Sequence, residues 1–430
     1  MLIFIFLYIA LVKHWLRDKV RCEMSNYVKR QVFIVMKTRE PIVYVKRTII
    51  LSLLFALVYW GYAKITSHDK EKATLQAMKE EEKEVKKEVK KEEVKKEEVV
   101  EKPKEEVVAE QPPQEINNHA QLDEYMKSKN FSGTAVVVKN GEVLLNKGYG
   151  LANQEKKVAN NSETSYYIGS ITKAFVATSI MQLKEQNKLN IQDTVAKYIP
   201  DFPRGGEIKL VHLLTHTSGI PEYSEGSESI THEELIRRIG KQKLAFPPGS
   251  QWKYSDSNYS VLAYIAEKVS GQSLQDYIQK NIFEVVGMKH SGFGDQFQQG
   301  KYPSTGYKIV DNKMTTPAVP SMSQLFGCGD IYTTAYDLYL FDQALFTGKL
   351  ISSDSYQQMF TAVKKEYGFG WYVNPGSYSN HGVMPGWNCL NSFSKDGNTY
   401  VVLLSNIQNN IKSFGVVSND IYTMVRHEEG

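Results

Sequence analysis

The chain has 430 residues and a net charge of +4, from 52 basic and 48 acidic side chains. Its basic residues form no stripe with interleaved aromatic residues, so we expect no nucleic-acid partner. The 26 tyrosines, 18 phenylalanines and 5 tryptophans are typical of a folded enzyme rather than a disordered scaffold. The spacing of Cys22, Cys328 and Cys389 matches no zinc or disulfide framework. We expect Cys328 and Cys389 to be two free or buried thiols, with a disulfide between them as the alternative.

The first part of the chain predicts a membrane anchor. Residues 47–65 contain the run TIILSLLFALVYWGYAKI, close to the ~20 apolar residues that a spanning helix needs. Basic residues precede this run and aromatic residues gather at its far end, so residues 1–46 are expected in the cytoplasm and the rest outside. A chain that started at Met36 would carry an ordinary basic segment before the anchor. Residues 1–35 are therefore either a true extension or lie upstream of the actual start.

Residues 66–115 consist largely of Lys, Glu and Val in imperfect KKEEV repeats. A five-residue repeat matches neither the helical period of 3.6 nor the strand period of 2, so no continuous apolar face forms. We interpret this segment as a disordered spacer between the membrane and a folded domain at residues 116–430.

The folded domain is predicted to be of mixed α/β (α+β) class. Phe131 to Tyr149 has the pattern of a β-hairpin that turns at Asn140-Gly141. The segments YGFGWYV, WNCLNSF and TYVVLLSNI predict strands near the end of the chain, and residues 413–427 predict a last helix. Strands at both ends with helices between them indicate one antiparallel sheet built from both ends of the domain, flanked by helices, with an inserted helical subdomain.

Ser170 and Lys173 are the first candidates for chemistry. Ser170 opens the apolar run ITKAFVATSIMQL, in which Lys173 is the only ionisable residue. Such a run predicts a helix buried nearly all round, with Ser170 at its N-terminus, where free N–H groups favour an oxyanion. Lys173 follows one turn later on the same face, and burial is expected to lower its pKa so that it acts as a base. The alternative is a Ser N-cap followed by a lysine that reaches the surface.

Tyr254 and Asp256 lie in WKYSDSNY, just before an amphipathic pattern that ends at Gly271. Tyr254 is a candidate proton carrier whose phenol is tuned by a neighbouring lysine. The alternative interpretation makes Asp256 an ordinary helix N-cap.

A third cluster, Asn380-His381-Gly382-Val383, falls between C-terminal strands. Gly382 would allow close approach of the backbone to a ligand, and the N–H of Val383 would be a second oxyanion donor. The alternative is an ordinary loop. His212 and His216 stand four residues apart, but no third ligand supports a metal site, so we expect structural histidines and no metal.

Several segments resemble the class C β-lactamase-like family, which includes penicillin-binding proteins, D-alanyl-D-alanine carboxypeptidases, D-aminopeptidases and esterases that remove D-alanine from teichoic acids. They are SITK at 170–173, LLTHTSGIPEY at 213–223, PPGSQWKYSDSNYSVLAYIAEKVSG at 247–271 and FGCGDIYTTAYDL at 326–338. The resemblance runs from about Phe131 to the C-terminus and implies a β-lactamase/transpeptidase-like fold. It also implies an acyl-enzyme mechanism without a cofactor.

Two departures from the family pattern bear on the substrate. Asp256 stands where the family most often has Asn, and Asn380 stands where it usually has Lys or His. Both changes count against a substrate carboxylate and favour an ester that carries an ammonium. We therefore expect a D-alanyl esterase or peptidase acting on cell-wall substrates, outside the cytoplasmic membrane of a bacterial envelope of the Gram-positive type. The alternatives are a β-lactamase and a catalytically silent wall-binding or sensor protein.

Overall fold

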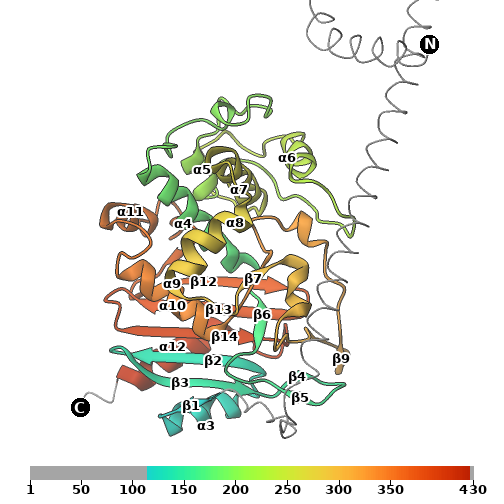
Figure 1. The fold of residues 1–430 in the computed structure, drawn as a ribbon, viewed down its shortest axis with the longest axis vertical. Coiled ribbons are helices and arrows are strands. Elements are labelled where there is room, and N and C mark those ends of the chain that lie inside the picture. Colours follow the sequence, from blue (N-terminus) through green and yellow to red (C-terminus); the bar gives the residue numbers. More distant parts are fainter. Residues whose placement is uncertain (1–113, 427–430) are drawn as a thin grey trace, which may run out of the picture. The chain divides into compact units, whose positions relative to one another are not determined.

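A seven-stranded antiparallel sheet forms the centre of the computed structural model, which describes residues 114–426 (Figure 1). Both ends of the domain contribute strands, as the sequence predicts. In spatial order they are β1 (Ile116–Asn117), β3 (Glu142–Tyr149), β2 (Gly133–Lys139), β14 (Thr399–Ser405), β13 (Trp387–Ser394), β12 (Ser377–Met384) and β11 (Tyr372–Val373).

The hairpin of β2 and β3 turns at Asn140 and Gly141, with φ values of 51° and 82°. Two successive positive φ values define the type I′ turn that Asn-Gly favours, so the predicted hairpin is confirmed. β2 is almost wholly buried because both faces of the sheet are covered. Val136 and Val138 belong to the core on one face, and Ala135 and Val137 to the core on the other.

Ten α-helices are described in residues 114–426. α3 (Ala120–Ser128) and α12 (Phe414–Arg426) cover one face of the sheet. The others cover the opposite face or extend beyond the β12 side of the sheet, where α5 to α7 lie (Figure 1). They are α4 (Thr172–Glu185), α5 (Leu210–Leu214), α6 (His232–Gly240), α7 (Ser257–Ser270), α8 (Leu274–Ile278), α9 (Glu284–Val286), α10 (Ala335–Phe346) and α11 (Ser353–Met359).

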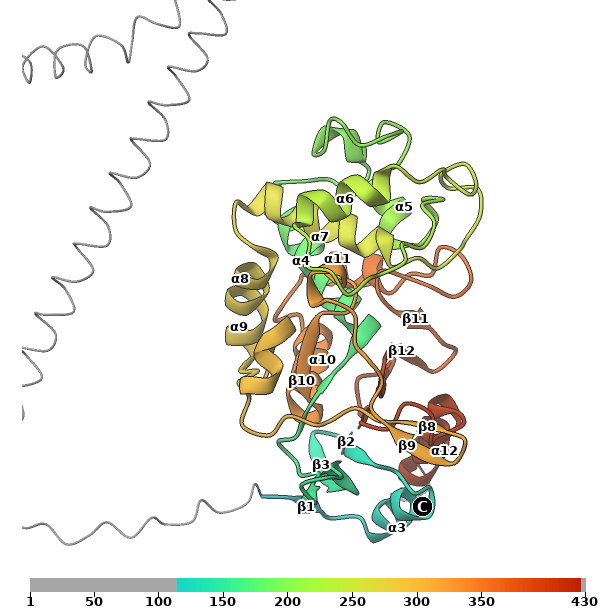
Figure 2. The same ribbon diagram turned by 90° about the vertical axis from the view of Figure 1, so that its right-hand side faces the viewer.

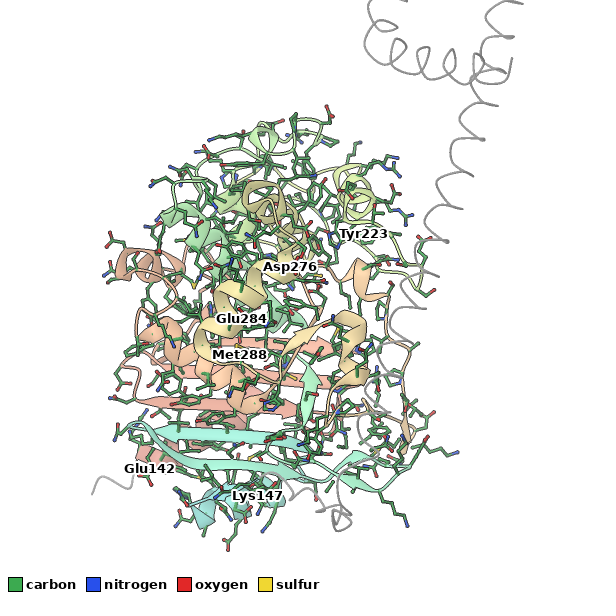
Figure 3. The ribbon with its side chains drawn as sticks, in the orientation of Figure 1. Glu142, Lys147, Tyr223, Asp276, Glu284 and Met288 are labelled. Carbon is green, nitrogen blue, oxygen red and sulfur yellow. The ribbon has the colours of Figure 1, made fainter. Side chains whose placement is uncertain are left out.

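Short elements connect these parts. The minor strands are β4 (Leu151–Asn153), β5 (Val158–Ala159), β6 (Ser165–Tyr167), β7 (Gly292–Phe293), β8 (Lys308–Val310), β9 (Lys313–Thr315) and β10 (Ile331–Thr334). Single turns of 3₁₀-helix occur at η1 (Gly169–Ile171), η2 (Val195–Lys197) and η5 (Met322–Gln324), a longer one at η4 (Gly294–Gln299), and a π-helical turn at η3 (Gln279–Phe283). Figure 2 shows the sheet between α10 on one side and α12 on the other, and Figure 3 shows side chains in the space between the sheet and the helices.

α4 crosses the middle of the domain and is buried at every residue from Thr172 to Leu183. This confirms the prediction from its apolar run. Its neighbour α7 ends at Gly271, which has a φ of 72° and closes the helix in the left-handed conformation.

Two expectations about the C-terminal part are wrong. Of the predicted strand at residues 367–373, only Tyr372–Val373 forms, because Gly370, at a φ of 80°, packs against the backbone of Ala174 instead of continuing a ladder. Residues 380–384 are not a loop, since they pair with β13 throughout as part of β12. Cys328 and Cys389 are both free and buried.

None of the helices within residues 114–426 has the length and apolar character required to cross a bilayer. The predicted cytoplasmic segment, the anchor at 47–65 and almost all of the spacer lie outside the described residues.

Candidate active site

Ser170 lies in η1, the single turn that leads into α4, and its side chain is half-buried. The turn is possible because Gly169 adopts a φ of 49°. The N–H groups at the start of a buried helix have no partner within the helix, so the Ser170 hydroxyl stands where negative charge is favoured.

Lys173 points at this hydroxyl from one turn further along. Its ammonium is 1% exposed and donates hydrogen bonds to Ser170 Oγ at 3.0 Å and to the carbonyl oxygen of Cys328 at 2.9 Å. A third partner, Asp256 Oδ1, lies 2.6 Å from Lys173 Nζ. The lysine therefore does not reach the surface, and the alternative interpretation of the Ser-x-x-Lys segment is excluded.

The expected lowering of the Lys173 pKa is wrong. Burial is the largest single influence and acts to lower it, but Asp256, through its charge and its hydrogen bond, together with Tyr254 and Cys328, raises the pKa of Lys173 well above its usual value. Sequence reasoning counted the burial of the amine and missed its counter-ion. In the resting site, Lys173 and Asp256 form an ion pair in which the amine is buried and the carboxylate is partly exposed.

Asp256 occupies the N-cap position of α7, yet its side chain caps no N–H of that helix. The carboxylate turns to Lys173 instead, so the N-cap interpretation of this residue is wrong. Tyr254 lies nearby, with its ring centroid 5.1 Å from Lys173 Nζ. Burial, only partly offset by the positive charge of Lys173, raises the pKa of Tyr254 to about 12.

Behind Tyr254 lies His216, which is fully buried and packs against the tyrosine at a centroid distance of 4.3 Å. Burial and the nearby Lys173 hold the pKa of His216 well below its usual value, so the ring is neutral. Its Nδ1 accepts the backbone N–H of Ser255 and lies 3.1 Å from the Asn258 amide. His216 and His212 have separate contacts, since His212 Nδ1 accepts the Lys209 N–H.

β12 approaches η1 so closely that only glycines fit at the contact. A Cβ on Gly382 would lie 1.8 Å from the carbonyl oxygen of Ile168 and 3.1 Å from the nitrogen of Ser170. A Cβ on Gly169 would lie 3.0 Å from the nitrogen of Val383. The backbones of Ser170 and Val383 therefore meet at one place, as two oxyanion donors must.

The site opens into a cavity of about 260 Å³. Its wall includes Asn380 and His381, the two residues that precede Gly382 in β12. Both belong to the third cluster predicted from the sequence. The complete set of lining residues is Ser170, Tyr254, Tyr367, Gly370, Tyr372, Asn380, His381 and Val383. Sequence reasoning missed Tyr367, Gly370 and Tyr372 because it assigned them to a strand without reference to the site.

Two further acidic residues that sequence reasoning missed, Glu222 and Glu225, lie beside Asp256. One carboxylate oxygen of each of the three lies within 4.8 Å of those of the others. The Asp256 N–H donates to Glu222 Oε2 at 2.9 Å. Partial burial and then the charge of Asp256 raise the pKa of Glu222 to about 7, although this side chain keeps contact with solvent. Within residues 114–426 these are the residues best placed to hold a cation, but Lys173 already balances Asp256.

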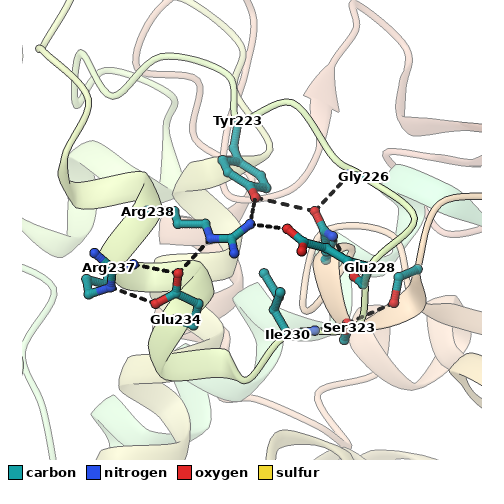
Figure 4. Close-up of polar contacts among 10 residues, drawn as sticks. Tyr223, Gly226, Glu228, Ile230, Glu234, Arg237, Arg238 and Ser323 are labelled. Carbon is teal, nitrogen blue, oxygen red and sulfur yellow. Dashed lines mark hydrogen bonds and ion pairs between the residues drawn. The ribbon is translucent and has the colours of Figure 1, made fainter.

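Residues 221–228, here termed the acidic loop, carry Glu222 and Glu225. Hydrogen bonds and an ion pair hold both ends of this loop. Tyr223 N donates to Ser257 Oγ at 3.0 Å, and Ser257 Oγ donates to the carbonyl oxygen of Pro221 at 2.9 Å. Figure 4 shows Arg238 of α6 between Glu234, Glu228 and the Tyr223 hydroxyl. The sequence signal for this loop was the segment IPEY at residues 220–223, which belongs to LLTHTSGIPEY at 213–223.

The fold and this arrangement define a class of protein, the serine hydrolases with a β-lactamase/transpeptidase-like fold. Residues 119–418 match the model of the beta-lactamase family, and the chain belongs to that family.

Several relatives agree with this assignment. The chain is 51% identical over 314 residues to PbpX of Bacillus subtilis (strain 168), a protein named as a penicillin-binding protein, covering 73% of this chain and 80% of the relative. It is 30% identical over 262 residues to the teichoic acid D-alanine hydrolase of Staphylococcus aureus (strain MRSA252), covering 60% of this chain and 66% of the relative. The crystal structure of FmtA from Staphylococcus aureus superposes with a TM-score of 0.65 at 27% identity, over 70% of this chain and 89% of that chain.

Proposed function

We propose that this chain is a membrane-anchored serine hydrolase that removes D-alanyl groups from esters of cell-wall polymers outside the cytoplasmic membrane. One observation carries the proposal: the buried Lys173 that touches Ser170 is balanced by Asp256 at 2.6 Å. The site therefore has a nucleophile and a base but no spare positive charge for a substrate carboxylate. A relative named as a teichoic acid D-alanine hydrolase supports the choice of ester.

The reaction begins in molecules in which Lys173 has released its proton to solvent. The neutral amine then accepts the Ser170 proton across 3.0 Å, and Oγ bonds to the carbonyl carbon of the ester. The N–H groups of Ser170 and Val383 hold the negative oxygen that results. When the ester C–O bond breaks, the proton returns to the leaving alcohol through Lys173 and Tyr254. Attack by water on the acyl-enzyme repeats these steps and releases the acid.

The charge around Asp256 matches an aminoacyl substrate. Glu222 and Glu225 add two carboxyl groups beside Asp256, and the cavity lining includes no Lys or Arg. An α-ammonium lies only two bonds from the carbonyl that Ser170 attacks, so it would come close to these carboxylates.

A labelled fluorophosphonate tests the nucleophile. We expect stoichiometric labelling of the full-length protein and none of Ser170→Ala, whereas labelling that survives this substitution would reject the proposal.

Turnover of three substrates tests the reaction: a D-alanyl ester, a peptide ending in D-Ala-D-Ala, and nitrocefin. We expect kcat/KM to be highest for the ester. Faster turnover of nitrocefin would instead indicate a β-lactamase. Binding to cell walls without turnover of any substrate would indicate a silent wall-binding protein.

A further inference from the structure

We propose that His216 is a positioning residue for the reaction, which holds Tyr254 where its hydroxyl can give a proton to the leaving alcohol. The inference rests on the proposed function, because Tyr254 is the residue that returns the proton in that reaction. It gives a role to the histidine of the segment THTSG at 215–219, which the proposed mechanism does not use.

The position of Tyr254 depends on contacts from outside its own segment. Residues 251–255 belong to no helix or strand, and α7 begins only at Ser257. Tyr254 nevertheless lines the cavity together with Ser170, and its ring centroid is 5.1 Å from Lys173 Nζ. A misplacement of about 1 Å in an active site can slow a reaction by about 10²-fold. The contacts that hold this segment therefore matter for the chemistry.

His216 bonds to the segment on both sides of Tyr254 and packs on the tyrosine itself. Its carbonyl oxygen accepts the N–H of Lys253 at 3.0 Å, and its Nδ1 accepts the N–H of Ser255 at 3.3 Å. The rings of His216 and Tyr254 lie at a centroid distance of 4.3 Å and an interplanar angle of 33°. The residues before and after Tyr254 are thus bonded to the residue on which its ring rests.

The ring of His216 also connects this segment to the wall of the cavity. Because the ring is neutral and its Nδ1 accepts a backbone N–H, the proton is on Nε2. Nε2 lies 3.3 Å from the hydroxyl of Tyr367, a lining residue, and donates to it. A second proton, on Nδ1, would break the bond to Ser255, and burial together with Lys173 holds the pKa of His216 too low for it. The ring therefore keeps one fixed set of hydrogen bonds.

The backbone of His216 supports this interpretation. Its φ of 54° lies in the left-handed region, which costs a residue other than glycine of the order of 1–3 kcal/mol. Such a conformation persists only where the surrounding contacts hold the residue in place, and it is concentrated at functional sites.

A purely structural histidine is the competing explanation. His216 is fully buried, and its ring also packs against Tyr259 and Tyr367. Removing the ring from this position would lower the stability of the protein whether or not His216 positions Tyr254. A loss of activity alone does not distinguish the two explanations, so the test has to report on the proton that Tyr254 gives.

The test compares two D-alanyl esters whose leaving groups differ in their need for that proton. A propyl alkoxide must take up a proton as the C–O bond breaks, whereas para-nitrophenolate leaves as the anion. We define the ester ratio as kcat/KM for the propyl ester divided by kcat/KM for the para-nitrophenyl ester. In full-length Tyr254→Phe we expect this ratio to fall by about 10²-fold relative to the unaltered protein.

His216→Phe keeps a ring but removes both ring nitrogens. The ester ratio should fall about tenfold or more, because the proton carrier is displaced. Added to Tyr254→Phe, the same substitution should change the ratio no further, since the group through which it acts is gone. His212→Phe is the matched control and should keep the ratio of the unaltered protein. It removes an equivalent bond, between His212 Nδ1 and the Lys209 N–H.

An unchanged ester ratio in folded His216→Phe would overturn the inference, and so would a further tenfold fall when it is added to Tyr254→Phe. If His216→Phe does not fold, an unchanged ratio in His216→Gln, which also loses the ring packed on Tyr254, overturns it equally. An unchanged ratio in Tyr254→Phe would reject the inference and leave Ser170 as the nucleophile. Failure of the unaltered protein to hydrolyse either ester would instead reject the proposed function.

Discussion

At the scale of single residues, the charge state of Lys173 governs the chemistry. Burial acts to lower its pKa, while the Asp256 carboxylate, with smaller contributions from Tyr254 and Cys328, acts to raise it, and together these groups prevail. The family's more common Asn at the position of Asp256 would leave the buried amine without a counter-ion. The Asp therefore changes the pH at which the base becomes available, rather than the identity of the base.

Replacing Asp256 by Asn tests this directly. The substitution removes the largest of the influences that raise the pKa of Lys173, so burial meets less opposition and the pKa falls. A base works only when deprotonated, so the rising limb of acylation rate against pH should move to lower pH by at least about one unit. The measurement is the rate of fluorophosphonate labelling between pH 5 and 10. Asp311→Asn, in the exposed turn between β8 and β9, is the control and should leave the profile in place. An unmoved profile in Asp256→Asn would mean that the ion pair does not control the base.

At the scale of secondary-structure elements, the site depends on the contact between η1 and β12. Neither element forms an oxyanion site alone, because each supplies one N–H. The absence of side chains at Gly169 and Gly382 brings the two backbones together.

Gly382→Ala should separate the two donors. The added Cβ would meet the Ile168 carbonyl oxygen at 1.8 Å, so β12 must move away from Ser170. We expect acylation to slow by about 10²-fold or more, as for loss of one oxyanion donor. Gly376→Ala, just before β12, places its Cβ in open space and should acylate normally. Normal acylation by Gly382→Ala, measured by labelling and with folding checked by thermal unfolding, would contradict the assignment of Val383.

The packing of α10 on the sheet buries a second, non-catalytic carboxyl. Asp342 is fully buried; one of its oxygens accepts from Asn391 and the other has no partner within residues 114–426. Burial raises the pKa of Asp342 well above its usual value. The folded protein therefore holds a proton that the unfolded chain releases above about pH 4.

This proton makes the stability of the protein fall as pH rises. Above pH 4 the folded state binds more protons than the unfolded state, so Asp342 lowers the free energy of unfolding by up to about 1.4 kcal/mol per pH unit. Asp342→Asn removes this contribution while keeping the shape. Its melting temperature relative to the unaltered protein should thus be higher at pH 7 than at pH 4. A difference in melting temperature that is constant between pH 4 and 7 would show that Asp342 does not hold the proton.

At the scale of the whole molecule, the prediction concerns the segments before the folded domain. The apolar run at 47–65, with basic residues before it, predicts that the full-length protein is found with membranes. Deleting residues 1–65 should move the protein to the soluble fraction while fluorophosphonate labelling of Ser170 persists. Protease added to spheroplasts should remove the hydrolase domain of the full-length protein. Protection of that domain would contradict the proposed orientation.

The sequence alone determined those features that depend on neighbours along the chain. The Asn140-Gly141 turn, the burial of α4 and the one-turn spacing of Ser170 and Lys173 follow from local patterns, because helix and turn geometry are set within a few residues. The order of the family-like motifs, together with the strands predicted at both ends of the folded domain, was enough to predict the fold class. Distant partners were not predictable in this way. The tertiary structure alone placed Asp256 against Lys173, Glu222 beside Asp256, and Tyr367 in the lining of the cavity. A pKa depends on charges within a few ångströms in space, and spacing along the chain does not reveal which charges those are.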